Sequence, residues 1–325
     1  TRSTSTATGC FLTPQTWAGD HVRVGVTAGR EKTGGANQTI IGTDLKIQKS
    51  AGTYVEAEIA QTRGPGFGNS VSSDGGATSI DVLGAGAPGQ RANGYRAEAH
   101  VDVADITNGT MKGDLEARFE DKQSGFATLD EQITGHKRDI AVKGDLEVSS
   151  SVTVGGGYAR SSTAGGSKEQ AADAQATFKL GDKWSFSPGM RFSQRHVTTG
   201  SNTDKGSRVD AGGKITYQAD DDHSAYVFGQ VTAQHSDGRK RNDRIGVGGT
   251  TKLSEKVTGT GEVSYGTGGW GGLAQLAYNP TADDTYYAGY RLDPDRHSAL
   301  NSSFGLVGDD LGAIVAGMKH RYSER

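Results

Sequence analysis

The chain has 325 residues, of which 50 are glycine and only 33% belong to the hydrophobic set, so it lacks the apolar content of an ordinary soluble protein of this length. Its 35 basic and 38 acidic side chains give a formal net charge of -3, which argues against nucleic acid as a partner. The single cysteine, Cys10, excludes a disulfide framework and a cysteine-rich metal site, and no apolar run approaches the roughly 20 residues of a membrane-spanning helix.

After residue 18, apolar and polar residues alternate with a period of two along nearly the whole chain, which is the pattern of half-buried β-strands. In the clearest segment, mainly charged residues alternate with an apolar set made of Tyr95, Ala97, Ala99, Val101 and Val103. The same alternation is found in four later segments, 111–120, 139–148, 172–180 and 208–217. No stretch of comparable length has a helical period. The sequence therefore predicts an all-β protein.

Short turns and longer polar loops alternate between these segments. Short turns include 149–150, 181–183 and 254–256, whereas long loops include 63–91, 122–132 and 198–206. The segments have about 10–14 residues, and a tilted strand needs ~9–11 to cross a bilayer. Outer-membrane barrels have short periplasmic turns and longer extracellular loops. We therefore predict an antiparallel up-and-down transmembrane β-barrel of about 16 strands, with an N-terminal extension at 1–18 and the barrel at 19–325.

A soluble antiparallel protein is the alternative, because alternation also suits a sheet with one face in water. Its strands would usually have about 5–6 residues, which is shorter than these segments, and no solenoid repeat is visible. Aromatic residues near segment ends, such as Trp184, Tyr217 and Tyr278, are typical of the girdles at a membrane interface. These observations favour a bacterial outer-membrane location, with lipid or detergent around the barrel.

Several runs of residues also suggest a family. The run 53–60 (TYVEAEIA), followed by 64–68 (GPGFG) and Asp74-Gly75-Gly76, and the run 115–121 (LEARFED), followed by 124–126 (SGF), resemble large, poorly characterised outer-membrane proteins of alphaproteobacterial type. That resemblance implies a long carboxy-terminal barrel and assigns no ligand. In that pattern another strand would follow residues 319–325, so we expect the chain to be a fragment of a longer barrel.

The charged residues of the alternating segments must point away from lipid. A barrel of about this width is wide enough for an aqueous channel. We therefore predict a passive pore for small hydrophilic solutes, weakly ion-selective because the charges nearly balance. The predicted pore-lining residues are Arg96, Glu98, Asp102, Lys112, Asp114, Glu116, Arg118, Lys143, Glu147, Asp173, Lys179, Arg191, Arg208, Asp210 and Lys214.

The long segment from Arg63 to Arg91 is predicted to fold inward and narrow the pore. Loops of this length tend to be functional or disordered, and its glycines permit a tight backbone path. The equally weighted alternative is an extracellular loop that leaves the pore open. The candidate constriction residues are Arg63, Gly64, Gly66, Phe67, Gly68, Asp74, Asp81 and Arg91.

No catalytic motif is visible in the sequence. Residues 64–69 lack the final glycine, the lysine and the following helix of a phosphate loop, and the eight histidines are dispersed. We therefore expect no enzymatic activity, no metal and no cofactor. The alternative function is a non-conducting barrel that anchors or displays a surface, adhesive or interaction module. A homo-oligomer or a larger outer-membrane assembly is compatible with either function.

Overall fold

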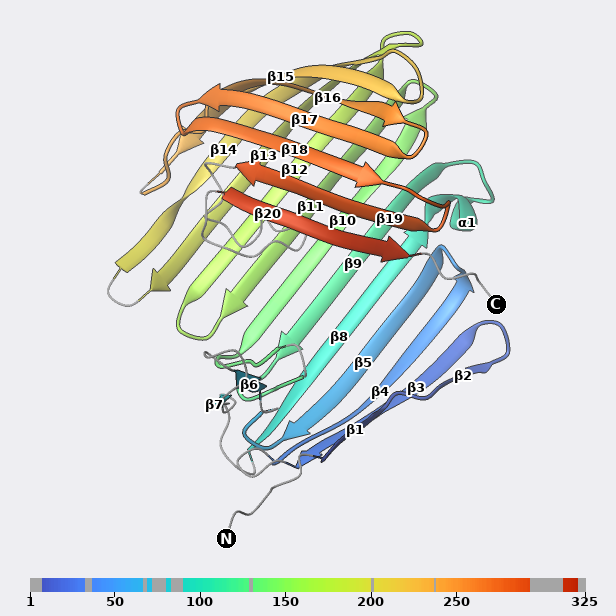
Figure 1. The fold of residues 1–325 in the computed structure, drawn as a ribbon, viewed down its shortest axis with the longest axis vertical. Coiled ribbons are helices and arrows are strands. Elements are labelled where there is room, and N and C mark those ends of the chain that lie inside the picture. Colours follow the sequence, from blue (N-terminus) through green and yellow to red (C-terminus); the bar gives the residue numbers. More distant parts are fainter. Residues whose placement is uncertain are drawn as a thin grey trace. The chain divides into compact units, whose positions relative to one another are not determined.

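The computed structural model describes residues 8–32, 37–66, 69–71, 80–82, 90–128, 131–199, 202–236, 238–292 and 312–320. Within these residues, eighteen strands belong to one antiparallel sheet, and β6 (Asn69–Val71) pairs with β7 (Ile80–Val82) in a second, two-stranded sheet (Figure 1). The predicted all-β antiparallel fold is therefore confirmed. Among the described residues, no helix is long and apolar enough to cross a membrane.

The strands overlap all five predicted segments of alternation. The one helix in the described residues is α1 (Val103–Thr107), which lies in a short turn. The strands of the large sheet are β1 (Thr8–Leu12), β2 (Gln15–Ala18), β3 (Val22–Lys32), β4 (Asn37–Ser50), β5 (Thr53–Arg63), β8 (Arg91–Asp102), β9 (Lys112–Lys122), β10 (Lys137–Ser149), β11 (Val152–Thr163), β12 (Ser167–Lys179), β13 (Trp184–Thr199), β14 (Asn202–Gln218), β15 (His223–His235), β16 (Arg244–Ser254), β17 (Val257–Gly266), β18 (Gly269–Tyr278), β19 (Asp284–Leu292) and β20 (Gly312–His320).

Compared with the predicted segments, β12 and β14 begin five and six residues earlier. Two expectations are wrong: most of the predicted loop 198–206 belongs to β13 and β14, because polar residues there continue the sheet, and Val103 lies in a helix and not in a strand.

The chain divides into two compact units, which are described separately. The first contains Thr1–Gly144 with Ala159–Lys168, and the second contains Asp145–Tyr158 with Glu169–Arg325. In the first unit, β3, β4, β5, β8 and β9 pair in chain order, and both β1 and β2 pair with the free edge of β3. In the second unit, β13 to β20 pair in chain order. The barrel boundary at residue 19 stays a prediction, and β1 and β2 precede it.

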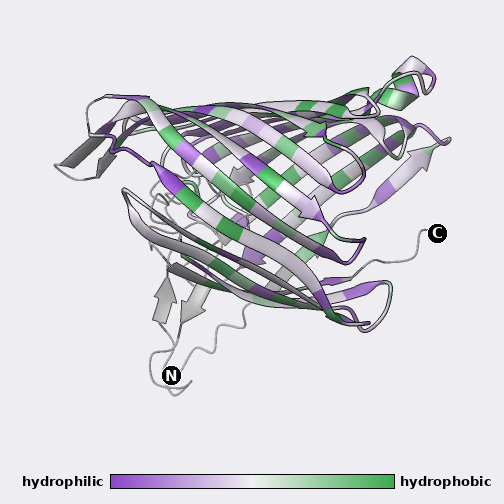
Figure 2. Ribbon diagram, turned by 90° about the horizontal axis from the view of Figure 1, so that it is seen from above, coloured by the Kyte–Doolittle hydropathy of each residue, from purple (hydrophilic) through white to green (hydrophobic). Residues whose placement is uncertain are grey.

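Each unit exposes one apolar face of its strands. On β4, for example, Ile41, Leu45 and Ile47 are 68%, 42% and 53% exposed, while the intervening Asp44 and Lys46 are half-buried. Figure 2 shows this alternation of hydrophobic and hydrophilic residues along the strands. We call the first side the apolar face and the opposite side the polar face.

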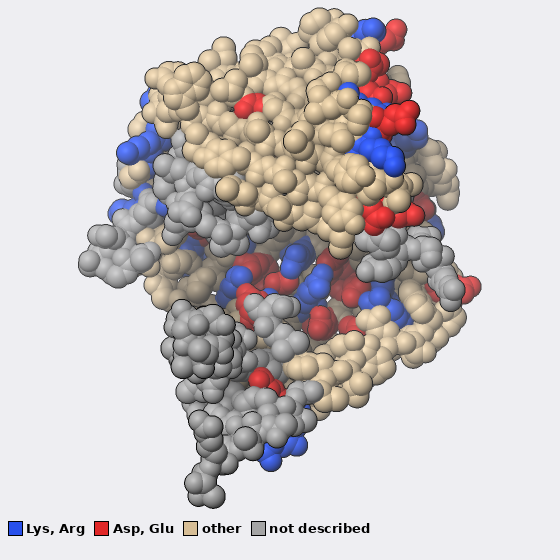
Figure 3. Space-filling view, viewed as in Figure 1, with Lys and Arg blue, Asp and Glu red and all other residues tan. Residues whose placement is uncertain are grey.

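The second unit has an apolar face of its own. Val227 and Val231 of β15, and Ile245 and Val247 of β16, are all exposed. Figure 3 shows the near side of these strands almost free of charged side chains, with charges gathered at the strand ends. Exposed apolar area on this scale mainly marks a surface that meets lipid or a partner. It therefore favours the membrane interpretation over a soluble sheet.

Part of the glycine excess has a packing role on the polar face. A Cβ atom added at Gly246 would lie 2.4 Å from the ring of Phe228, and one added at Gly248 would lie 2.4 Å from Cζ of Tyr226. Both aromatic rings come from the neighbouring strand, β15, and lie against these glycines of β16. Glycine at the two positions thus makes room for the rings.

Candidate functional site

The polar face of the first unit carries a network of ion pairs that crosses its strands. Arg23 Nη2 lies 2.9 Å from Glu56 Oε1 and 3.6 Å from Asp44 Oδ2, which links β3, β4 and β5. On β8, Arg96 Nη2 donates to Glu98 Oε2 at 2.7 Å. Charged side chains of opposite sign are thus interleaved across neighbouring strands, and each carboxylate in these pairs has a cationic partner.

An aromatic side chain extends the contacts around Glu98. The Tyr54 hydroxyl donates to Glu98 Oε1 at 2.9 Å, and the Lys46 ammonium lies 3.8 Å from the centre of the Tyr54 ring. The imidazole of His100 stacks on the same ring, with 5.8 Å between the ring centres. These contacts link β4, β5 and β8, beside the ion pairs by which Arg23 links β3 to β4 and β5.

The predicted pore-lining residues of β8, β9 and β10 occupy the continuation of this network. His100 Nε2 lies 3.5 Å from Asp114 Oδ1, and Lys143 Nζ lies 2.9 Å from Glu116 Oε2. Arg118 pairs with Glu120 in the same way. The structure thus brings Arg96, Glu98, Asp114, Glu116, Arg118 and Lys143 to one face, although their role in lining a pore stays a prediction.

Three of the predicted pore-lining residues lie apart from this network. The Asp102 carboxylate accepts a hydrogen bond of 2.8 Å from the backbone N–H of Ala104 and so caps α1 in a short turn. Lys112 is exposed at the start of β9, and Glu147 is exposed on the portion of β10 that belongs to the second unit.

The polar face of the second unit contains a pocket of about 570 Å³. Four predicted pore-lining residues contribute to it: Asp173, Arg191, Asp210 and Lys214. Arg208 lies beside it and is 5% exposed, with its Nε donating to Asp210 Oδ2 at 2.7 Å. Lys179 is exposed at the far end of β12 and is outside the pocket lining.

The pocket also contains residues that the sequence did not single out. The Tyr226 hydroxyl donates to Glu262 Oε2 at 2.6 Å, and Lys214 Nζ lies 5.4 Å from the centre of the Tyr226 ring. Phe228, Gln175 and Gln230 complete the aromatic and amide part of the lining. Their position on the polar side of alternating strands is the signal in the sequence that points to them.

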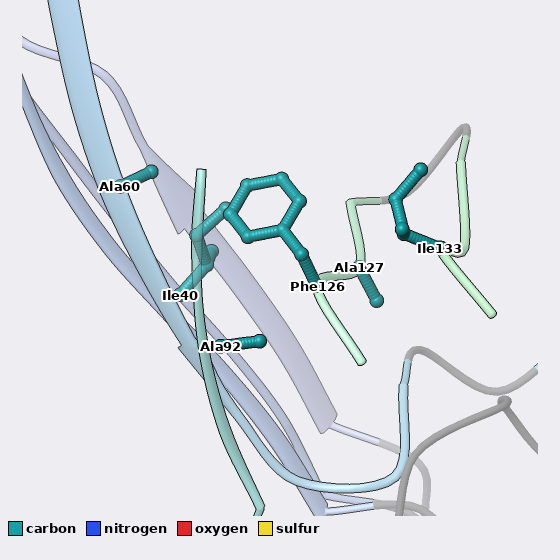
Figure 4. Close-up of a cluster of buried hydrophobic side chains, with 6 residues drawn as sticks. All are labelled: Ile40, Ala60, Ala92, Phe126, Ala127 and Ile133. Atoms are coloured by element: carbon teal, nitrogen blue, oxygen red, sulfur yellow. The ribbon is translucent and has the colours of Figure 1, made fainter. Parts of the chain in front are cut away.

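In the described residues, the connection from β9 to β10 packs on the polar face of the first unit. Phe126 of this loop packs with Ile40 of β4, Ala60 of β5 and Ala92 of β8 (Figure 4). A Cβ atom at Gly94 would lie 2.7 Å from the Phe126 ring, so glycine is needed beneath it. The segment from Arg63 to Arg91, which is predicted from its length to narrow the pore, is a separate connection.

The residues of that longer segment are placed only in part. Gly64 and Gly66 are buried, and the Gly66 N–H donates to Gln38 Oε1 at 2.8 Å. Arg63 and Arg91 are exposed on the apolar face. Phe67, Gly68 and Asp74 lie outside the described residues, and Asp81 lies on β7 with its side chain outside the description. The constriction by this segment stays a prediction.

Glu131 fastens the β9–β10 loop to the strands. Its carboxylate lies 2.5 Å from Lys122 Nζ and 3.3 Å from Lys137 Nζ. Burial of the Glu131 carboxyl would raise its pKa, but the hydrogen bond and charge of Lys122, together with Lys137, outweigh burial and hold the pKa below its usual 4.5. The ionised form is therefore favoured by the folded loop.

This pairing predicts a loop that loosens in acid. Because the folded pKa of Glu131 is lowered, its contribution to stability is present above pH 4.5 and is lost as the pH falls through the lowered pKa. We expect the hydrogen-exchange protection of residues 125–133 to decline in that range. In the Glu131→Gln variant, the hydrogen-exchange protection of this loop should already be low at pH 7 and should decline little as the pH falls. A wild-type loop whose protection is unchanged at pH 3 would contradict this expectation.

Comparison with known proteins gives a likeness in fold. No protein-family model and no curated protein matches the chain. The open form of the ferric-catecholate import receptor Fiu from E. coli K12 has a TM-score of 0.50 and 11% identity, covering 89% of this chain and 63% of that one. The ferripyoverdine receptor of the Pseudomonas aeruginosa outer membrane has a TM-score of 0.47 and 12% identity, covering 98% of this chain and 57% of that one. This chain thus spans less than two thirds of either protein. The fold is that of an outer-membrane β-barrel, which confirms the predicted fold class and agrees with the predicted location.

Proposed function

We propose that the chain forms part of an outer-membrane β-barrel that passes small hydrophilic solutes. The observation that carries this proposal is the pocket of about 570 Å³ on the polar face of the second unit. Its lining offers cations, anions, amides and a phenol, which are the groups that replace water around a polar solute. The ion pairs on the polar face of the first unit give that face the same wettable character.

The pocket is open because of how its rings are seated. Tyr226 and Phe228 lie against the backbone at Gly248 and Gly246, where no side chain occupies the space. The rings therefore extend less far into the pocket than they would above a larger residue. Charged groups of both signs line the pocket. The cationic side chains are Arg191 and Lys214, and the anionic ones are Asp173, Asp210 and Glu262. This mixture supports weak ion selectivity.

A second candidate function is that of a receptor that binds its solute before passage. The pocket's combination of Tyr226 and Phe228 with the cation of Lys214 favours this candidate, since such a site suits an aromatic anion. Fiu is described as a ferric-catecholate import receptor. The likeness to Fiu concerns the fold, and the ligand of this chain is a separate question that binding measurements answer.

Single-channel recording in a planar bilayer tests the proposal. A pore gives defined conductance steps, and Lys214→Glu should raise the permeability of K⁺ relative to Cl⁻, because it reverses a charge that lines the pocket. Lys183→Glu is the matched control, since Lys183 is exposed in the turn between β12 and β13. The absence of conductance steps, or equal shifts of the K⁺/Cl⁻ permeability ratio in both variants, would contradict the proposed pore. Saturable solute binding without steps would favour the receptor.

A further inference from the structure

Three arginines form a row across the apolar face of the first unit. The register pairs Arg30 of β3 with Thr39 of β4, Thr39 with Arg63 of β5, and Arg63 with Arg91 of β8. Each arginine lies an even number of residues from the exposed apolar residues of its strand and therefore shares their face. The row lies at the ends of these strands that lead into the long connections, just beyond the apolar band.

Without a bound anion, this row of like charges lowers the stability of the sheet. Arg63 and Arg91 are direct cross-strand neighbours, and like charges placed opposite each other destabilise a sheet. Within the described part of the chain, none of the three guanidinium groups takes part in an ion pair or a side-chain hydrogen bond. On the same face, Asp121 pairs with Tyr95 in the register, and its carboxylate is held by His136 at 2.8 Å and by Arg138 at 2.6 Å.

A groove of about 450 Å³ runs along the row. Its lining combines the three arginines with apolar side chains, among them Leu12 and Ile41, which are 61% and 68% exposed. Guanidinium groups bind phosphate through two parallel hydrogen bonds, and exposed leucine and isoleucine accept hydrocarbon chains. The groove therefore has a cationic part that suits a phosphate headgroup and an apolar part that suits an acyl chain.

We propose that the arginine row binds the phosphate of a membrane lipid, whose acyl chains lie along Leu12 and Ile41. A soluble anion would satisfy the charges but leave the apolar half of the groove uncovered. A neutral lipid would cover the apolar half but leave three cations without a counter-charge. The inference rests on the apolar face meeting lipid and is independent of whether the chain conducts solutes.

Phosphatidic acid and diacylglycerol with identical acyl chains form the decisive pair of probes, because they differ only in the phosphate. The purified full chain in neutral detergent is titrated with each lipid, and bound lipid is counted by native mass spectrometry. We expect phosphatidic acid to bind at least about tenfold more tightly than diacylglycerol, about 1.4 kcal/mol, because only its phosphate accepts charge-assisted hydrogen bonds from the arginines.

The double variant R63Q/R91Q should lose that preference. The matched control is K183Q/K256Q, which also removes two positive charges but from exposed turns remote in sequence. R63K/R91K should bind with intermediate affinity, because lysine keeps the charge but cannot form two parallel hydrogen bonds. Circular dichroism verifies that each variant retains its β-structure.

Several outcomes would overturn the inference. These are equal binding of both lipids by the wild type, an unchanged preference in folded R63Q/R91Q, and an equal loss in K183Q/K256Q. Displacement of phosphatidic acid by millimolar inorganic phosphate would identify a site for a soluble anion and would also overturn it. If R63Q/R91Q fails to fold, the folded lysine variant must show the intermediate affinity, and wild-type affinity in that variant would count against the proposal.

Discussion

Replacement of Leu115 or Val142 by arginine is expected to lower the free energy of unfolding by about 2–4 kcal/mol, the cost of a charge on the lipid-facing side of a barrel strand near the bilayer midplane. Leu115 is 48% exposed and Val142 is 49% exposed, and both lie on the apolar face. Their chain neighbours Glu116 and Lys143 form an ion pair on the opposite face. A guanidinium at either position would therefore replace an exposed apolar side chain on the face that meets lipid.

Urea unfolding in lipid vesicles measures this cost. Thr216→Arg is the control, because Thr216 lies on the polar face, where it pairs in register with Ser185 and Tyr226. That substitution should change the free energy of unfolding by much less. Equal effects at all three positions would show that the assignment of the two faces is wrong.

Removal of residues 124–134, with a Gly-Gly join, is expected to raise single-channel conductance if the chain conducts. This part of the β9–β10 loop places Phe126 and Ile133 against the polar faces of β4, β5 and β8. Its removal uncovers that surface and leaves the paired strands intact. The measurement is the size of the conductance step in a planar bilayer, together with the largest neutral polymer that enters the pore.

A second deletion separates this loop from the one expected from sequence length. Deleting residues 69–86 tests the predicted constriction by the segment from Arg63 to Arg91. If only that deletion raises the conductance, the β9–β10 loop lies clear of the solute path. An unchanged conductance after both deletions would remove both loops from the pathway.

The alternation predicted strands and faces well because it is a local property of the chain. Leu115 and Val142 were assigned to the apolar side by parity alone, and their exposure agrees. The rule that alternate residues share a face no longer holds where a strand ends. Asp102 has the parity of the polar residues, yet its carboxylate caps α1, because the chain turns into a helix at the next residue.

The two N-terminal strands have no clear alternation because they are short and interrupted. β1 and β2 have five and four residues and are separated by Thr13 and Pro14. Proline cannot donate a hydrogen bond to a sheet, so it breaks the pattern that a search for alternation requires. The Pro14 carbonyl still accepts a hydrogen bond of 3.0 Å from the N–H of Val26, and both strands align along β3.

The loop contacts were beyond the reach of the sequence for a different reason. Ile40, Ala60 and Ala92 are apolar residues at polar-face positions, and they are 8%, 5% and 1% exposed only because Phe126 and its loop cover them. Three isolated exceptions on three strands form no local pattern. The strand register brings the three residues together beneath Phe126. Loop length carries no information about this contact.

The seating of Tyr226 and Phe228 on glycine means that the chemistry and the dimensions of the pocket are encoded on different strands. β15 supplies the rings, whereas β16 supplies only the space beneath them through Gly246 and Gly248. A small side chain introduced on β16 would lift a ring and narrow the pocket without adding or removing a charge. Size preference and charge preference can therefore change independently, in evolution or by engineering, through substitutions on adjacent strands.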